Sequence, residues 1–86
     1  MARSKRIIME LTVDNATGYA EIRNNGSLEA VVEAKDREAN TWLVTAANGG
    51  TATCSSHYMA IEAAKVIATH HYKWEGYKVT VKEITA

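Results

Sequence analysis

The residues whose types could do chemistry are one cysteine and three histidines. Cys54 and His57 have the spacing of half a zinc site, but no second half follows them in the sequence. His70 lies thirteen residues beyond His57 in the same predicted helix, roughly 20 Å away at about 1.5 Å of rise per residue. Because one ion cannot span that distance, we expect no metal site.

Nucleophilic catalysis is the other chemistry that these residues suggest. Cys54 precedes the N-terminus of the predicted helix, a position that favours a thiolate, and His57 is close in sequence. No third residue that would orient His57 stands out, and Asn48-Gly49-Gly50 lacks the Lys-Ser/Thr of a phosphate-binding loop. We therefore expect no catalytic residue, no cofactor and no enzymatic activity, and we interpret Cys54 as a structural residue at the edge of the core.

The element that must position these side chains is a helix predicted for residues 56–73. Ser56 offers a hydroxyl cap, no Gly or Pro interrupts the next four turns, and Gly76 ends the helix. At about 100° per residue, one face gathers small and apolar side chains that would pack on a sheet, with His57 and His71 at its ends: Ala60, Ile61, Ala64, Ile67 and Ala68. The opposite face is predicted to be polar and exposed: Glu62, Lys65, Thr69 and Lys73.

A second, narrower apolar stripe lies beside the core-facing side of this helix. It consists of Met59, Ala63, Val66 and His70, which follow one another at steps of four, three and four residues. The stripe is either the edge of a wide core contact or a surface for a partner or a second subunit. Trp74 leaves the same choice open, as a cap on the core or as an exposed anchor for a partner.

The rest of the chain consists of short alternating segments separated by turn residues. Leu28–Lys35 also contains good helix formers behind Ser27, but the hairpin signal Asn24-Asn25-Gly26 favours a strand there. Alternation of apolar and polar residues predicts strands near 6–13, 19–23, 28–35, 41–46, 51–54 and 77–84.

These elements predict an α+β fold, in which an antiparallel β-sheet meander is covered on one face by the single helix 56–73. Residues 1–86 are expected to form a single domain that begins with a flexible basic tail, residues 1–5. We expect the first strand or the short strand that begins at Thr51 to be a free sheet edge that accepts a partner strand.

Composition and charge limit the functional classes. A chain of 86 residues has one small core and no room for an internal active-site cleft. Ten basic and ten acidic residues cancel, which argues against a general polyanion binder. A single cysteine fits a reducing compartment, and no signal-peptide region or membrane span stands out. We therefore expect a cytoplasmic protein without a membrane partner.

Binding of nucleic acid is the alternative that the basic residues support. An uncovered outer sheet face, together with the basic tail, would present positive charge and a stacking tyrosine: Arg3, Lys5, Arg6, Tyr19, Arg23, Lys78 and Lys82. Carboxylates on the same faces would repel phosphate: Glu10, Glu21, Glu29 and Glu33.

The second half of the chain resembles a group of very small strand–helix–strand proteins encoded by bacteriophages, among them inhibitors of host RNA polymerase and anti-CRISPR proteins. The resemblance covers residues 41–84: a Trp-bearing strand (41–45), a glycine turn, an alanine-rich helix segment (59–68), Gly76 and a final strand (77–81). It implies a protein that occupies a surface of a larger host protein or complex without catalysing a reaction.

The prediction from the sequence is thus a non-enzymatic protein-binding module, such as a phage or mobile-element inhibitor of a host enzyme or defence complex. The predicted contact residues are Met59, Val66, His70 and Trp74. Self-association as a homodimer is a further expectation, because a dimer would bury the extra apolar stripe.

Overall fold

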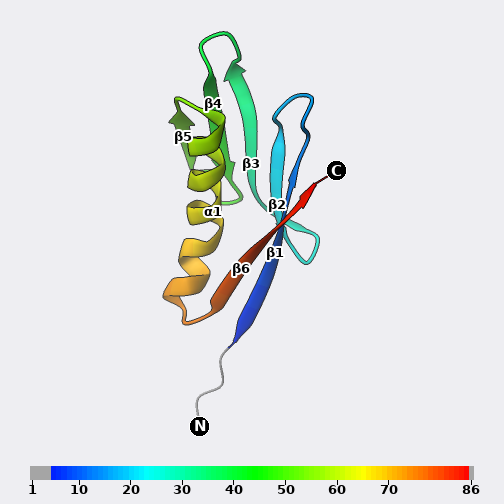
Figure 1. Cartoon of the computed structure of the whole chain (residues 1–86). Coiled ribbons are helices and arrows are strands. Elements are labelled where there is room, and N and C mark those ends of the chain that lie inside the picture. Colours follow the sequence, from blue (N-terminus) through cyan, green and yellow to red (C-terminus); the bar gives the residue numbers. More distant parts are fainter. Residues whose placement is uncertain (1–4, 86) are drawn as a thin grey trace.

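The computed structural model describes residues 5–85, which form six strands and one helix (Figure 1). The predicted α+β class is confirmed: a mostly antiparallel sheet carries a single helix on one face. In chain order the elements are β1 (Arg6–Val13), β2 (Ala20–Asn24), β3 (Ser27–Asp36), β4 (Thr41–Ala46), β5 (Thr51–Cys54), α1 (His57–Trp74) and β6 (Lys78–Thr85).

The sheet has the strand order β5-β4-β3-β2-β1-β6, and β6 is the one strand whose pairing is parallel. The first five strands form the predicted meander, each antiparallel to the next. Helix α1 then carries the chain from the β5 edge back across the sheet, so β6 enters in the same direction as β1 (Figure 1). The prediction that the first strand is an edge is therefore wrong, because β6 covers it. The strand at Thr51 is an edge, as expected.

Strand β3 settles the assignment that the sequence left open. Its residues pair with β2 on one side and with β4 on the other, which outweighs the helix propensity of Glu and Ala in this segment. The turn before it is a tight hairpin, since Asn25 and Gly26 have φ values of 52° and 88°. Opposite Ile22 and Arg23 the pairing passes from Ala30 to Leu28, so Glu29 is an extra residue in a β-bulge.

Helix α1 begins and ends where the sequence indicates. The Ser56 side chain accepts a hydrogen bond from the Met59 backbone N–H at 3.1 Å, and Gly76 follows the helix with a φ of 96°. The alanines of its buried face, Ala60, Ala64 and Ala68, lie against the sheet. Within residues 5–85, no helix is long and apolar enough to cross a membrane.

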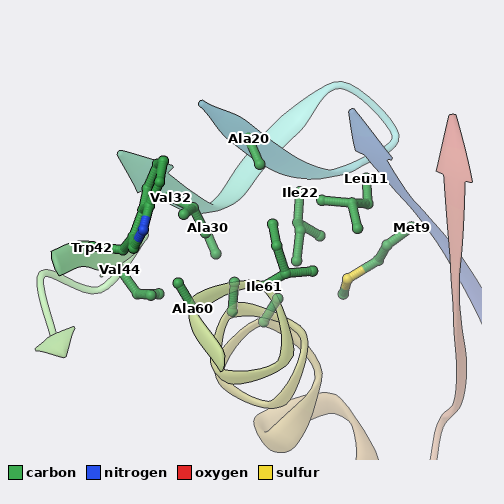
Figure 2. Close-up of a cluster of buried hydrophobic side chains, with 12 residues drawn as sticks. Met9, Leu11, Ala20, Ile22, Ala30, Val32, Trp42, Val44, Ala60 and Ile61 are labelled. Carbon is green, nitrogen blue, oxygen red and sulfur yellow. The ribbon is translucent and has the colours of Figure 1, made fainter. Parts of the chain in front are cut away.

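The core lies between α1 and the inner face of the sheet. Figure 2 shows buried side chains of β1, β2, β3 and β4 pointing toward the helix. The largest fully buried ones are Met9, Leu11, Ile22, Val32 and Val44. Trp42 is buried at one end of this layer, where its ring meets the His57 ring edge-on at a centroid distance of 4.7 Å. Its Nε1 donates a hydrogen bond to Asn40 Oδ1 at 2.7 Å, so the indole is buried with its polar atom satisfied.

The position of Thr69 corrects the predicted polar face of the helix. Thr69 is only 3% exposed, although the helical pattern placed it away from the core. Near the C-terminal end of α1 the returning strand β6 lies close beside the helix, and Thr69 faces Val79 and Val81 across a groove. The Thr69 hydroxyl donates to the Lys65 carbonyl oxygen at 2.7 Å, so its burial leaves no unpaired polar atom.

Gly18 gives the first testable prediction. It has a φ of 81°, and a Cβ added there would collide with the Trp42 ring and press on the His57 ring. We expect Gly18→Ala to lower the free energy of unfolding by about 2–4 kcal/mol, through left-handed strain and overpacking. Chemical denaturation measures the change. Gly49→Ala is the matched control, because Gly49 has a similar φ of 93° in open space and should lose only about 1–2 kcal/mol. Equal losses in the two variants would contradict the role of the Trp42 contact.

Candidate functional site

The side of α1 that faces away from the sheet exposes large apolar side chains. Val66 is 63% exposed, Met59 is 52% exposed, and Ala63 between them is half-buried. His70 continues the line and is also exposed. Met59, Val66 and His70 of the predicted stripe therefore lie at the surface, whereas Ala63 packs against the core. We call Met59, Val66, His70 and Trp74 the outer helix face.

Trp74, the last residue of α1, is 84% exposed and so does not cap the core. It lines a shallow hollow together with His70, His71 and Glu75. His71, expected at the end of the buried arc, is exposed and lies 3.7 Å from the Glu75 carboxylate. The C-terminal turn of the helix thus presents an indole and two imidazoles to solvent.

The reason for this exposure lies in the length and position of α1. Its alanine face packs on β3 and β4, and no second layer covers the opposite side within the described residues. A residue at the very end of the helix has little of the sheet beneath it. Trp74 is followed by Glu75 and the turn at Gly76, from which the chain enters β6 (Figure 1).

A polar contact fixes the C-terminal half of α1 over the sheet. The Tyr72 hydroxyl donates a hydrogen bond to the Glu29 carboxylate at 2.8 Å. The bulge at Glu29 places this side chain next to the buried Ala30. Because the carboxylate holds the Tyr72 proton, the pKa of Tyr72 is raised above its usual value of 10. This hydrogen bond links the C-terminal half of α1, which carries part of the outer helix face, to β3.

Cys54 and His57, the residues considered for catalysis, both make packing contacts. Cys54 is half-buried and packs against the core, in line with a structural role. The Nε2 atom of His57 lies 2.8 Å from the Gly18 carbonyl oxygen, and its ring contacts Trp42, so His57 joins the helix start to the β1–β2 loop. Among residues 5–85 there is no group of three or more His, Cys, Asp or Glu side chains that could hold a metal ion.

The residues of the nucleic-acid alternative fall into two groups on the outer face of the sheet. Tyr19 and Arg23 meet at Glu21: the Tyr19 hydroxyl donates to it at 2.8 Å, and Arg23 Nε forms an ion pair with it at 3.0 Å. These bonds lower the pKa of Glu21, the Arg23 bond contributing most. The tyrosine and one of the cations that could bind nucleic acid are therefore already bonded to Glu21, a carboxylate of the same face.

The second basic group lies on the same face nearer the β6 edge, on β1 and β6. Arg6 is next to Lys78 in the register, and Lys82 is next to Glu10, which offsets part of its charge. The Lys5 ammonium lies 5.4 Å from the Tyr77 ring centroid, and the Lys5 carbonyl accepts a hydrogen bond from the Lys78 N–H. Residues 1–4 of the predicted basic tail 1–5, including Arg3, lie outside the described residues.

A groove between α1 and β6 is the surface feature that sequence reasoning missed. Its floor is apolar and its rim is charged, and Tyr58 lies exposed at one end of it. Alternation along β6 indicates that Val79 and Val81 face the helix, but the gap beside them depends on where α1 crosses the sheet. The main lining residues are Glu62, Lys65, Val66, Thr69, Lys73, Val79 and Val81.

The exposure of Val66 leads to a prediction about stability. Val66→Glu should leave the protein folded and change the free energy of unfolding by no more than about 0.5 kcal/mol, because the new carboxylate stays in water. Ala64→Glu is the control on the buried face of the same helix and should prevent folding, because it places an unpaired charge in the core. Circular dichroism with denaturation distinguishes them. Unfolding of the Val66 variant would show that Val66 belongs to the core.

Removing the Tyr72 hydroxyl tests the contact that holds the helix end. Tyr72→Phe should cost about 1 kcal/mol of stability at pH 7. The pKa of Tyr72 is higher in the folded protein than its value of 10 in the unfolded chain, so the hydrogen bond contributes its full stability below pH 10. This contribution is lost as the pH rises through the folded-state pKa. The difference between Tyr72→Phe and the unsubstituted protein should therefore shrink above pH 10. Tyr58→Phe, at an exposed tyrosine of the same helix, should be neutral. A constant difference across this pH range would contradict the assignment.

Comparisons with protein-family models, with curated proteins and with solved structures found no match to this chain. A function must therefore be inferred from the residues and surfaces of the molecule itself.

Proposed function

We propose that this protein is a non-enzymatic binding module whose outer helix face docks onto a larger host protein or complex. The observation that carries the proposal is the exposure of Met59, Val66 and Trp74 on one side of a single helix. Single exposed apolar residues are common, but a row of them that ends in a tryptophan is typical of an interface. Burying each such side chain in a partner gains about 25 cal/mol per Å² of apolar area.

The character of the outer helix face suits recognition of an apolar pocket or groove. The Trp74 indole offers a large, rigid contact area next to a shallow hollow lined by His70 and His71. Met59 adds a flexible side chain that adapts to a partner's shape. A helix presented on a sheet is already ordered, so docking costs little conformational entropy on this side of the contact.

The biological role that we propose is inhibition of a host enzyme or defence complex by a phage or mobile element. It rests on the resemblance of residues 41–84 to small phage proteins of strand–helix–strand pattern, and those residues do form a strand, a short strand, a helix and a final strand. A cytoplasmic location belongs to this proposal, since the free Cys54 suits a reducing compartment.

Nucleic-acid binding stays as the second candidate because Arg6, Lys78 and Lys82 lie on neighbouring strands at one side of the open sheet face. Glu10 beside Lys82 and the Glu21–Arg23 ion pair reduce the net positive charge of this face. We therefore rank it below protein binding.

Affinity capture from a bacterial lysate distinguishes the two functions. The tagged protein is incubated at low and high salt, with and without nuclease, beside Val66→Glu, Trp74→Ala and Lys82→Glu. Protein binding predicts one stoichiometric band that resists salt and nuclease, is lost with Val66→Glu and Trp74→Ala, and persists with Lys82→Glu.

The opposite pattern would support the second candidate. Material that disappears with nuclease or high salt and is lost with Lys82→Glu would mean that the open sheet face binds nucleic acid. A band that survives in all three variants would exclude the outer helix face as the contact surface.

A further inference from the structure

Strand β6 is a long sheet edge whose backbone is half unpaired. It runs for eight residues at the end of the sheet and, among residues 5–85, pairs only with β1, whereas the opposite edge strand β5 has four residues. The Lys78 N–H donates to the Lys5 carbonyl oxygen at 2.7 Å, so the backbone groups of Lys78 point toward β1. Because backbone direction alternates along a strand, the N–H and C=O groups of Val79, Val81 and Glu83 point outward, away from the sheet.

The groove defined above runs beside this edge on the helix side of the sheet. Val79 and Val81 are half-buried in its floor, and Lys73 and Val66 belong to the wall formed by α1. The groove continues past Tyr58 to Glu83 near the end of β6. The strand order places β6 at the border of the sheet, and Figure 1 shows its start close to the C-terminal end of α1. A strand added to the β6 edge would cover this apolar floor.

We propose that the strand that pairs with this edge is β6 of a second copy of the chain, antiparallel about a two-fold axis at Val81. In an antiparallel pair of identical strands related by a two-fold axis, directly opposite residues lie on the same face of the sheet. Because side chains alternate between the two faces, the numbers of two opposite residues add up to an even number, and the axis passes through one residue position. The axis at Val81 lies near the middle of the strand and gives long overlap. It sets Val81 against Val81, and Val79 against Glu83 of the second copy. These are the residues whose backbone groups point outward, so they form hydrogen-bonded pairs.

The charges on β6 select this register over its neighbours. An axis at Thr80 would place Lys78 opposite Lys82 of the second copy, twice, and an axis at Lys82 would place the two Lys82 side chains opposite each other. Like charges directly opposite destabilise a strand pair. With the axis at Val81, Lys82 faces Thr80 of the second copy, and Lys78 faces its Ile84.

The same register brings opposite charges together in the groove. Glu83 lies on the helix side of β6, and it comes opposite Val79 of the second copy. Val79 shares the groove with the exposed Lys73 of α1, so each Glu83 carboxylate lies near a Lys73 ammonium of the other chain. By symmetry the contact occurs twice. The dimer has one continuous sheet with both helices on the same face.

The dimer and the proposed function share one residue, since Val66 belongs both to the outer helix face and to the groove wall. His70 and Trp74 line a separate hollow and are not among the groove residues, so they stay accessible when two β6 strands pair, and Trp74→Ala reports on partner binding alone. Loss of the dimer and loss of partner capture can therefore be measured separately.

Sedimentation equilibrium over a wide concentration range tests the proposal, with Val81→Pro as the first variant. Proline removes an outward N–H, does not break the bonds to β1, and is tolerated at a sheet edge. We expect the unsubstituted protein to dimerise and Val81→Pro to raise the dissociation constant at least about tenfold. A folded, unsubstituted protein that stays monomeric at all concentrations would overturn the proposal.

Cysteine cross-linking tests the register itself and does not depend on whether the proline variant folds. In a Cys54→Ser background, Val81→Cys should form a disulfide-linked dimer on mild oxidation, because the two-fold axis places the two positions opposite each other. Thr80→Cys should not. Cross-linking through position 80 and not through position 81 would exclude this register.

A charge exchange tests the contact between Lys73 and Glu83 of the other copy. Lys73→Glu and Glu83→Lys should each weaken the dimer, and the two together should restore it. If the double variant does not restore the dimer, the Lys73–Glu83 contact is excluded.

Discussion

The packing of one alanine-faced helix against a wide sheet is the contact on which the rest of this molecule depends. Ala60, Ala64 and Ala68 bring α1 close to the sheet, where Val32 and Val44 fill the space beneath it (Figure 2). A single helix is narrower than six strands. Part of the inner sheet face beside β6, the whole outer sheet face and the far side of the helix therefore remain at the surface. In the described part of the chain, these three surfaces are open to other molecules.

The proposed function uses these surfaces and no enclosed site. The residues with catalytic potential, Cys54 and His57, are used in packing and in tying the helix start to the β1–β2 loop. The outer sheet face carries both signs of charge, and its Tyr19–Glu21–Arg23 cluster is internally bonded. By contrast, the outer helix face has apolar side chains with nothing over them in the described part of the chain, and the contact between Tyr72 and Glu29 holds the helix in place beneath them. Rigid support under exposed apolar groups is what a binding surface requires.

Local sequence patterns predicted most of the fold, because caps, turns and periodicity are properties of neighbouring residues. Ser56, Gly76 and the Asn25-Gly26 turn mark the helix and a hairpin in advance of any structure. Features that depend on distant segments were not predictable in the same way. The parallel pairing of β6, the burial of Thr69 and the groove all follow from where α1 crosses the sheet. The sequence also left Trp74 undecided, since an apolar residue at a helix end is buried only if another element reaches it.

The most direct test of the central claim is site-specific photo-crosslinking in a bacterial lysate, with the reactive residue placed either at His70 on the outer helix face or at Thr12 on the open sheet face. Both positions are exposed and lie on opposite sides of the molecule. Binding through the outer helix face predicts one discrete protein adduct from position 70 and none from position 12. Adducts from position 12 alone, or equal labelling from both positions, would contradict it.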